Sequence, residues 1–240
     1  MSSGSSSGRL TVGIIGAGAV GTVLGQALAS AGHIVIGASA VSSENVERVE
    51  AMLPGVPLLD VPEILSQADL VLLSIPAEEL IGTVAGLAEA KLWRPGQLVA
   101  HTSGEHGYSA LAAASQQGVI ALAIHPAMRF TGTSVDLARI RESYFAVAAP
   151  KVALPIAQAL VIEMGAEPVV IEESDRAKYY EAFEVAANFS ALIVNQAIGI
   201  LEEIGIEDAR GLIAPVVRTS VEQALAAGHK PIAPEDLIGQ

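Results

Sequence analysis

The chain has 240 residues, of which 51% are hydrophobic and only 16% are charged, whereas about 25% are charged in an average soluble domain. Its 13 basic and 26 acidic residues give a net charge of −13, which argues against attraction to nucleic acid or to an anionic lipid surface. Small-molecule or protein partners remain, and we expect a small-molecule substrate. The absence of cysteine excludes disulfides, Cys-ligated zinc and a thiol nucleophile, so we expect a cytoplasmic protein.

The sequence predicts neither a signal peptide at 1–8 nor a membrane span. Residues 1–8 are serine and glycine after the first methionine, without a basic or an apolar region, and we predict a disordered tail or tag. The most apolar window, 183–204, is interrupted by acidic and amide side chains. We therefore expect no membrane-spanning segment.

From Leu10 onward, short β-rich runs alternate with helical stretches, which is typical of a parallel sheet covered by crossover helices. The sequence predicts an α/β fold: a Rossmann-type doubly wound, mostly parallel sheet followed by a small all-helical dimerisation domain. The eight predicted strands are 10–15, 34–36, 57–59, 70–75, 98–102, 119–124, 144–148 and 168–171.

After Ser174 no β-rich run follows, and one helical pattern continues from Asp175 to about Ile204. We expect an NADP-binding Rossmann domain at 9–172 and a helical substrate and dimerisation domain at 173–240. The apolar residues of the long helix cover more than one face, and about 35 residues remain after it to bury them. A second copy of the chain could cover the helix, so we predict a homodimer joined through it.

A G-x-G-x-x-G motif follows the first predicted strand and opens the first predicted helix. In this context Gly16 permits a tight turn, Gly18 lets the backbone approach a pyrophosphate, and Gly21 allows close packing of helix on strand. The helix N-terminus adds N–H groups and a positive dipole end. The predicted dinucleotide-binding residues of this turn are Gly16, Ala17, Gly18, Ala19, Val20 and Gly21.

The end of the second strand carries serines where NAD-binding proteins have a carboxylate for the ribose hydroxyls. The hydroxyls of Ser39, Ser42 and Ser43, with Arg48 a turn beyond, could accommodate a 2′-phosphate, which favours NADP over NAD. Alternatively, Ser42 or Ser43 simply caps the helix that follows.

Three further strand ends reach the same carboxyl edge, where open α/β sheets bind ligands. Ser74, Ile75, Pro76 and Thr102 are expected beside the cofactor. His125, His101 and Ser103 are the candidate catalytic residues, because imidazoles exchange protons near neutral pH and hydroxyls bind a carbonyl. Arg129 could hold a carboxylate or phosphate. For both histidines the alternative is a structural hydrogen-bonding role.

In the helical domain, Asn188 could hydrogen-bond a substrate or the nicotinamide amide if the long helix crosses the mouth of the cleft; alternatively it is a hydrogen-bonded core asparagine. The histidines and acids at 101–125 lack a regular ligand spacing, so no metal site is predicted.

Several of these motifs together resemble a known family. The residues are the glycine motif at 16–21, the Ala68–Pro76 strand, His101-Thr-Ser-Gly104, His125-Pro126 and the Tyr180–Asn188 helix. They are similar to Rossmann-like NADP oxidoreductases with an uncharacterised helical second domain. That family lies within the superfamily of 6-phosphogluconate and β-hydroxyacid dehydrogenases. Its members often have a histidine where Glu181 stands here.

The resemblance implies an NADP-dependent oxidoreductase that passes a hydride to or from a small carbonyl, imine or hydroxy compound, with His125 as the acid or base. Two alternatives remain open: a protein that senses NADP(H) without turnover, and a deazaflavin-dependent reductase, suggested by relatives of the family.

Overall fold

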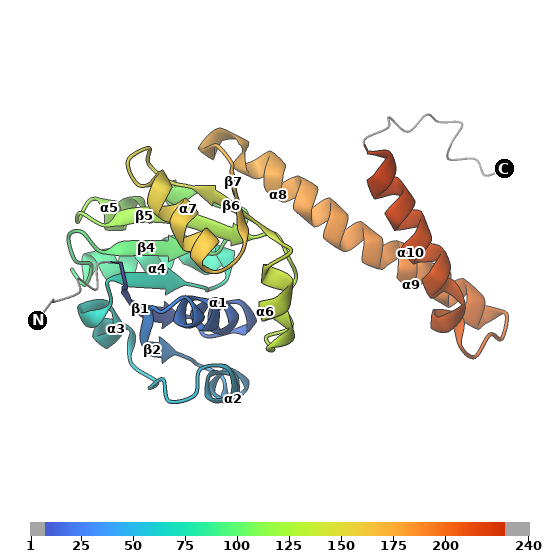
Figure 1. Ribbon diagram of the computed structural model, residues 1–240, viewed down its shortest axis with the longest axis horizontal. Coiled ribbons are helices and arrows are strands. Elements are labelled where there is room, and N and C mark those ends of the chain that lie inside the picture. The colour runs from blue at the N-terminus through green and yellow to red at the C-terminus, as the bar shows by residue number, and fades with distance from the viewer. Residues whose placement is uncertain (1–7, 229–240) are drawn as a thin grey trace, which may run out of the picture. The chain divides into compact units, whose positions relative to one another are not determined.

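The computed structural model of the protein describes residues 8–228, which divide into two compact units (Figure 1). The first unit ends at Tyr180 and the second begins at Glu181. The domain boundary expected at 172/173 stays a prediction. Residues 1–7 of the expected tail and 229–240 of the expected helical domain lie outside the described residues.

The first unit is built on a seven-stranded sheet with the order β2-β1-β3-β4-β5-β6-β7. All neighbours are parallel except β5 and β6, which pair antiparallel. This confirms the expected Rossmann-type, mostly parallel sheet. The strands are β1 (Thr11–Ile15), β2 (Ile34–Ser39), β3 (Leu70–Leu73), β4 (Leu98–His101), β5 (Ile120–Pro126), β6 (Tyr144–Ala148) and β7 (Glu167–Val170).

The strand predicted at 57–59 was wrong, because this segment forms only an isolated bridge between Leu58 and Ala38. Two hydrogen bonds flank Ala38, from its N–H to the Pro57 carbonyl and from the Leu59 N–H to its own carbonyl. The next residue, Asp60, already begins the following helix, so the chain turns away before a ladder can form. The apolar side chain of Leu59 packs on Gly37, which accounts for the strand-like pattern.

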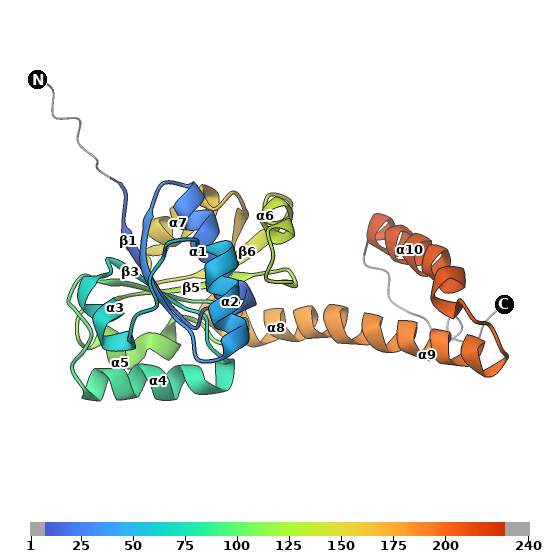
Figure 2. The same cartoon turned by 90° about the horizontal axis from the view of Figure 1, so that it is seen from below.

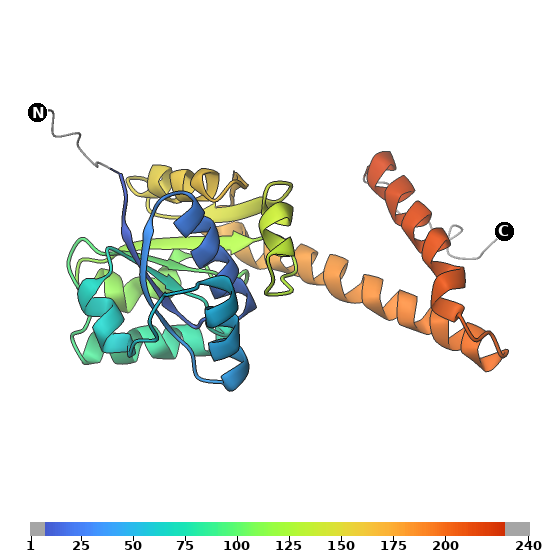
Figure 3. The ribbon, with the colours of Figure 1, turned by 60° about the horizontal axis from the view of Figure 1, so that its bottom comes forward.

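Helices cover both faces of the sheet. In Figure 2, α1, α6 and α7 lie on one face and α3, α4 and α5 on the other. Figure 3 shows α2 beside α1, near the edge strand β2. The bounds are α1 (Ala19–Ser30), α2 (Ser43–Met52), α3 (Val61–Gln67), α4 (Ala77–Glu89), α5 (Ala112–Ser115), α6 (Val135–Ile140) and α7 (Leu154–Glu163).

The core follows from the alternation of side chains along buried strands. In β3, Leu70 and Leu72 join the apolar cluster under α1 and α7, whereas Val71 and Leu73 join the cluster under α3 and α4. Every residue of β3 is buried, which is why the strand reads as a continuous apolar run. The sheet is thus fixed from both sides, and its carboxyl edge is held in register.

The helix predicted at 175–204 is confirmed, since the whole stretch Glu173–Glu203 is helical. It contains α8 (Arg176–Glu184), a π-helical turn (Val185–Phe189) that the sequence did not predict, and α9 (Ser190–Glu203). The first residues of α8 belong to the first unit. In the second unit, α9 packs on α10 (Ala209–Ala227), yet no side chain of α9 is buried.

This helical stretch also has the length and composition of a membrane span. It comprises 31 residues with a mean hydropathy of 1.4 in its most apolar window, and none of that window is buried within the described chain. A single helix of this kind is weak evidence for a membrane, because an interface helix of a soluble protein has the same properties. This helix therefore exposes an apolar surface that the described chain does not cover.

Candidate functional site

The strand order places a topological switch point between β1 and β3. From β1 the chain first adds β2 on one side and then β3 on the other, so the loops after β1 and β3 diverge to opposite faces. Ligands of open α/β sheets bind in the crevice that this divergence leaves at the carboxyl edge. The candidate site is therefore built from the ends of β1 to β5.

The glycine turn after β1 packs directly on the end of β3. A Cβ atom on Gly16, whose φ is +87°, would lie 2.4 Å from the Ser74 carbonyl oxygen. A Cβ on Gly21 would lie 2.4 Å from the Gly16 oxygen and 3.1 Å from the Ser74 Cβ. Both clashes involve backbone or short side chains that cannot move aside. Packing of the protein therefore requires these two glycines.

Gly18 differs from the other two glycines of the motif. A Cβ there would meet no protein atom closer than Asn45 Oδ1 at 4.0 Å, and its φ of −78° suits any residue. It is the N-cap of α1, and no side chain caps this helix end. The space beside the first N–H groups of α1 is thus open at Gly18. This is the geometry expected where the backbone approaches a pyrophosphate.

The end of β2 brings hydroxyls and a cation together. The Ser39 hydroxyl accepts a bond from the Gly16 N–H at 3.4 Å, and Ser42 caps α2 by accepting from the Asn45 N–H at 3.2 Å. Ser43 is the first residue of α2. The capping alternative thus describes Ser42, which lies three residues after the end of β2.

Arg48 lies beside this strand end and was noted in the sequence only as a neighbour of the serines. Its guanidinium donates to Asn45 Oδ1 at 2.6 Å and to Glu44 Oε1 at 2.7 Å. A Cβ on Gly132, in the loop after β5, would lie 2.6 Å from Arg48 Nε and 3.1 Å from the Ala19 Cα. The side chain of Arg48 therefore fits between the glycine turn and that loop, with 18% of it exposed.

The ends of β3 and β4 meet as the sequence predicted for neighbouring parallel strands. The Thr102 hydroxyl donates to the Ser74 hydroxyl at 3.3 Å. Ile75 is partly exposed, and Pro76 begins α4 as its N-cap. Ser74 and Ile75 lie directly against Gly16, so the ends of β3 and β4 adjoin the glycine turn.

His101 is fully buried, and backbone groups contact both of its ring nitrogens. Its Nδ1 accepts the Ser103 N–H at 3.3 Å, and its Nε2 lies 2.9 Å from the Gly107 carbonyl. Burial lowers the pKa of His101 to about 4, so the ring is neutral and donates from Nε2. The ring closes the loop 101–107, and the Ser103 hydroxyl accepts the His106 N–H within this loop.

Sequence reasoning missed Arg176, a buried residue whose side chain donates hydrogen bonds to the loop 101–107. Its side chain is 2% exposed and donates to the carbonyls of Gly104, His106 and Ser103 at 3.1 to 3.2 Å and to that of Ala146 at 3.5 Å. Arginine is rarely buried this deeply, and nothing around position 176 in the sequence indicates it.

Glu173, also missed, caps the short 3₁₀ helix that follows the loop. Its carboxylate accepts the Tyr108 and Ser109 N–H groups, each at 3.1 Å. A Cβ on Gly107 would lie 2.1 Å from Glu173 Oε2. Arg176 and Glu173 together fix the end of β4.

His125, at the end of β5, is 8% exposed and contacts a third residue that the sequence did not reveal. Its Nδ1 lies 2.7 Å from the Tyr179 hydroxyl, and the two rings meet edge to face at 5.6 Å. Burial, with a smaller contribution from the Arg176 cation, lowers the pKa of His125 to about 4. His125 Nε2 would lie 2.8 Å from a Cβ on Gly104, so the ends of β4 and β5 touch.

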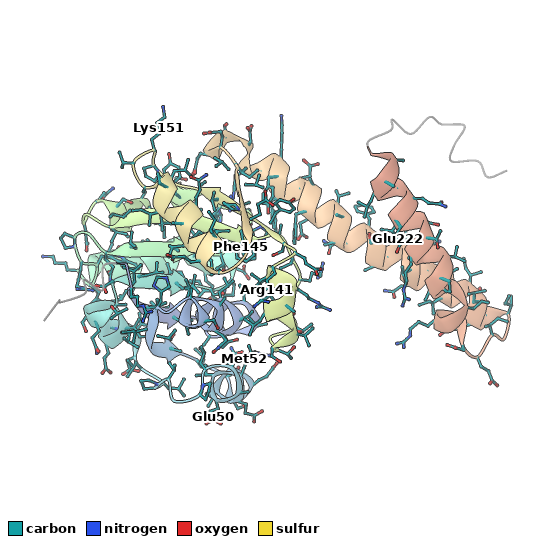
Figure 4. The ribbon with its side chains drawn as sticks, in the orientation of Figure 1. Glu50, Met52, Arg141, Phe145, Lys151 and Glu222 are labelled. Carbon is teal, nitrogen blue, oxygen red and sulfur yellow. The ribbon has the colours of Figure 1, made fainter. Side chains whose placement is uncertain are left out.

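Asn188 and Arg129 are the two remaining candidate residues. Asn188 belongs to the second unit, in the π-helical turn, and its amide donates to Glu184 Oε2 at 2.5 Å. Arg129 is exposed in the loop after β5. Within residues 8–228, no three His, Asp or Glu side chains are grouped so that they could hold a metal ion. The side chains that surround these elements are drawn in Figure 4, where Phe145 marks β6, the partner of β5.

Comparison with known families now decides the classification. Residues 1–126 match the family model of the Rossmann-like domain. The chain belongs to this family. Residues 143–233 of the Rossmann-like chain match a second model, the domain of unknown function DUF2520. Among curated proteins, none matches this chain significantly.

Solved structures with the same fold cover nearly the whole chain. A Bacteroides fragilis protein, BF3122, named as a candidate NADP oxidoreductase, is 17% identical with a TM-score of 0.73 over 93% of this chain and 85% of its own. A Streptococcus pyogenes 1-pyrroline-5-carboxylate reductase is 18% identical (TM-score 0.68; 96% and 84%). A Streptomyces aurantiacus imine reductase is 20% identical (TM-score 0.69; 88% and 73%). At these identities the likeness establishes the fold.

The two neutral histidines predict that the protein is destabilised in mild acid. Each has a folded pKa of about 4 and an unfolded pKa near 6.5, so below about pH 6.5 the unfolded chain binds protons that the folded chain does not. The free energy of unfolding should fall from about pH 6.5 to about pH 5, before most carboxyls titrate, by on the order of 1 to 4 kcal/mol. Urea unfolding at a series of pH values measures it.

The variant His125→Asn supplies the control, because it removes one of the two protons taken up on unfolding. The slope of unfolding free energy against pH should be about half that of the parent protein. A parent stability that stays constant over this pH range contradicts the neutral state of both rings.

Proposed function

We propose that this protein is an NADP-dependent oxidoreductase that transfers a hydride between the nicotinamide and a small carbonyl, imine or hydroxy compound. The observation that carries the proposal is Gly18. Packing explains Gly16 and Gly21, but no contact among the described residues requires a glycine at position 18, whereas close approach of a pyrophosphate does.

The residues present fit this cofactor along its length. Gly16 to Gly21 and the start of α1 would bind the pyrophosphate, and Ser74, Ile75, Pro76 and Thr102 would line the path toward the nicotinamide. A reduced nicotinamide supplies a hydride when bound. His125 is the proposed acid or base, since its ring lies at the same edge of the sheet.

The choice of NADP rests on the end of β2. Ser39 and Ser42 present hydroxyls there, no carboxylate ends the strand, and Arg48 supplies a cation between the glycine turn and the Gly132 loop. A guanidinium binds phosphate with charge-assisted hydrogen bonds, and Glu44 holds it in place from one side. The Bacteroides fragilis relative named as a candidate NADP oxidoreductase supports the same choice.

The imine reductase and the pyrroline-carboxylate reductase among the structural relatives favour turnover over sensing. The net charge of −13 and the absence of cysteine support a cytoplasmic location.

Turnover with NADPH tests the proposal. We expect oxidation of NADPH with at least one member of a panel of small keto acids, cyclic imines and aldehydes, and weaker activity with NADH. Arg48→Gln should raise the Kd of NADPH about 10- to 100-fold, the worth of one charge-assisted hydrogen bond, with little effect on NADH. Fluorescence titration measures both affinities.

Arg141→Gln is the matched control, since Arg141 (Figure 4) is exposed after α6 and lies near Ala27 and Ser30, at the end of α1 opposite the glycine turn. Tight binding of NADPH without turnover of any acceptor favours the sensing alternative. Tight binding of a deazaflavin in place of NADPH favours a deazaflavin-dependent reductase. Equal affinities for NADPH and NADH contradict the proposed role of Arg48.

We also propose that the protein is a homodimer joined through its second unit. Side chains of α9 and α10 are exposed although they are apolar: Leu192 62%, Ile193 63%, Ile200 55%, Leu212 57%, Val216 58% and Leu225 78%. Burial of each such side chain contributes about 1.5 to 3 kcal/mol. A two-fold related copy of the same helices would bury them, and two-fold dimers are the commonest soluble oligomers.

Sedimentation equilibrium should therefore give a mass of twice 24.6 kDa for the parent protein. Ile193→Glu should give the monomer, because a carboxylate in an apolar interface is costly. Gln223→Glu adds the same charge at an exposed position of α10 that is already polar, and should stay dimeric. A monomeric parent, or a parent that partitions onto lipid vesicles, contradicts the dimer.

A further inference from the structure

The start of α8 brings a fixed cation and a phenol to the catalytic candidate His125. Arg176 and Tyr179 are three residues apart on one helix, and therefore share a face. The Arg176 Cζ lies 5.4 Å from the centroid of the Tyr179 ring, while the Tyr179 hydroxyl lies 2.7 Å from His125 Nδ1. The phenol thus stands between the cation and the imidazole.

The Arg176 cation is held by four backbone carbonyls, and the described residues form no ion pair with it. Its charge is therefore not cancelled by an adjacent carboxylate, although Glu173 lies in its vicinity. A nearby positive charge opposes a second one, so it disfavours an imidazolium at His125. Burial raises the pKa of Tyr179, which keeps the phenol protonated and able to donate.

The charged group among the described residues that shifts the pKa of His125, Arg176, acts in the same direction as burial. From α8 His125 faces Arg176, Tyr179 and Tyr180, and from β4 it faces His101, which is itself neutral. Its partner across the β5–β6 ladder is Ala146. None of these groups is an anion at neutral pH, so nothing among them would stabilise a charged imidazole.

A neutral imidazole has one donor nitrogen and one acceptor nitrogen. We propose that Tyr179 is a positioning residue: its hydroxyl donates to Nδ1 and so holds His125 as the neutral tautomer whose proton is on Nε2, beside Gly104 at the carboxyl edge. This inference rests on the proposed oxidoreductase function and names the proton source of that reaction.

The proton balance of the reduction is then as follows. The acceptor carbon gains the hydride, and its oxygen or nitrogen gains the proton from His125 Nε2. Tyr179 passes its hydroxyl proton to Nδ1 in the same step, so the imidazole stays neutral and the negative charge resides on a phenolate near Arg176. The starting state is restored when the Nδ1 proton returns to the phenolate and Nε2 takes one proton from solvent, so the reduction consumes one solvent proton in all. Such a donor suits a neutral carbonyl or imine, whose heteroatom becomes strongly basic as the hydride arrives.

Long-range ¹⁵N–¹H correlation spectra of ¹⁵N-histidine-labelled protein test the tautomer directly. The parent should show His125 as the neutral Nε2–H form at neutral pH and still at about pH 5, above its low folded pKa. His125→Asn assigns the signal, because His101 should give a similar pattern. Tyr179→Phe should turn the His125 signal into a mixture of the two tautomers.

Tyr144→Phe is the matched control, since Tyr144 is 53% exposed at the start of β6 and its hydroxyl takes no part in this contact. It should leave the signal unchanged. With an active acceptor, Tyr179→Phe should lower kcat by about 10- to 100-fold while KM and the affinity for NADPH stay within about twofold.

Two results would overturn the proposal: an Nδ1–H tautomer at His125 in the parent protein, or a pure Nε2–H tautomer that persists in Tyr179→Phe. The first needs no variant, so it stands even if Tyr179→Phe fails to fold. A parent that shows the predicted tautomer but never oxidises NADPH contradicts the proposed function and leaves the role of Tyr179 in setting the tautomer intact.

Discussion

The candidate site depends on the close packing of the glycine turn against the end of β3. Since Gly16 and Gly21 have no side chains, the first turn of α1 comes within contact distance of the Ser74 backbone. This contact aims the N-terminus of α1 along the crevice at the switch point between β1 and β3. Any side chain at either position would push the helix away from the strand end. The open position of Gly18 follows from the same packing.

A second constraint, the burial of Arg176, organises the ends of β4 and β5 at the carboxyl edge of the sheet. In a chain with a net charge of −13, the most deeply buried cation of the described residues, Arg176, binds backbone carbonyls and forms no ion pair with a carboxylate among them. Those hydrogen bonds offset part of the cost of burying the charge and fix the loop that ends β4. The same charge, with burial, keeps His101 and His125 neutral. One side chain thus fixes the shape of the loop and adds to the effect of burial on the protonation of His101 and His125.

The sequence predicted those parts of the fold that depend on local pattern. Buried strands with alternating contacts to two cores, such as β3, read as continuous apolar runs, and the glycine motif marks the first turn unambiguously because it sits between a strand and a helix. The segment 57–59 failed because a single bridge and a packed leucine imitate the pattern of a strand.

The parts of the site that could not be predicted all depend on long-range contacts. Arg176 and Tyr179 lie more than fifty residues from the groups they touch at Gly104 and His125, and their type gives no hint of burial. Arg48 was visible as a cation near the serines, but its place between α1 and the Gly132 loop follows only from the packing of three elements.

Isothermal titration of NADPH into the parent protein and Gly18→Val tests the central claim most directly. The parent should bind, and Gly18→Val should weaken binding by roughly 100-fold or more, about 2.8 kcal/mol, because the space at Gly18 is open to a side chain but needed by the pyrophosphate. The loss of the N-cap glycine should lower the free energy of unfolding by about 1 kcal/mol at most, so the variant stays folded. Gly82→Val, at a glycine of α4 with equally open surroundings, should bind as the parent does. If Gly18→Val binds NADPH as tightly as the parent, the dinucleotide does not lie on this turn and the account is contradicted.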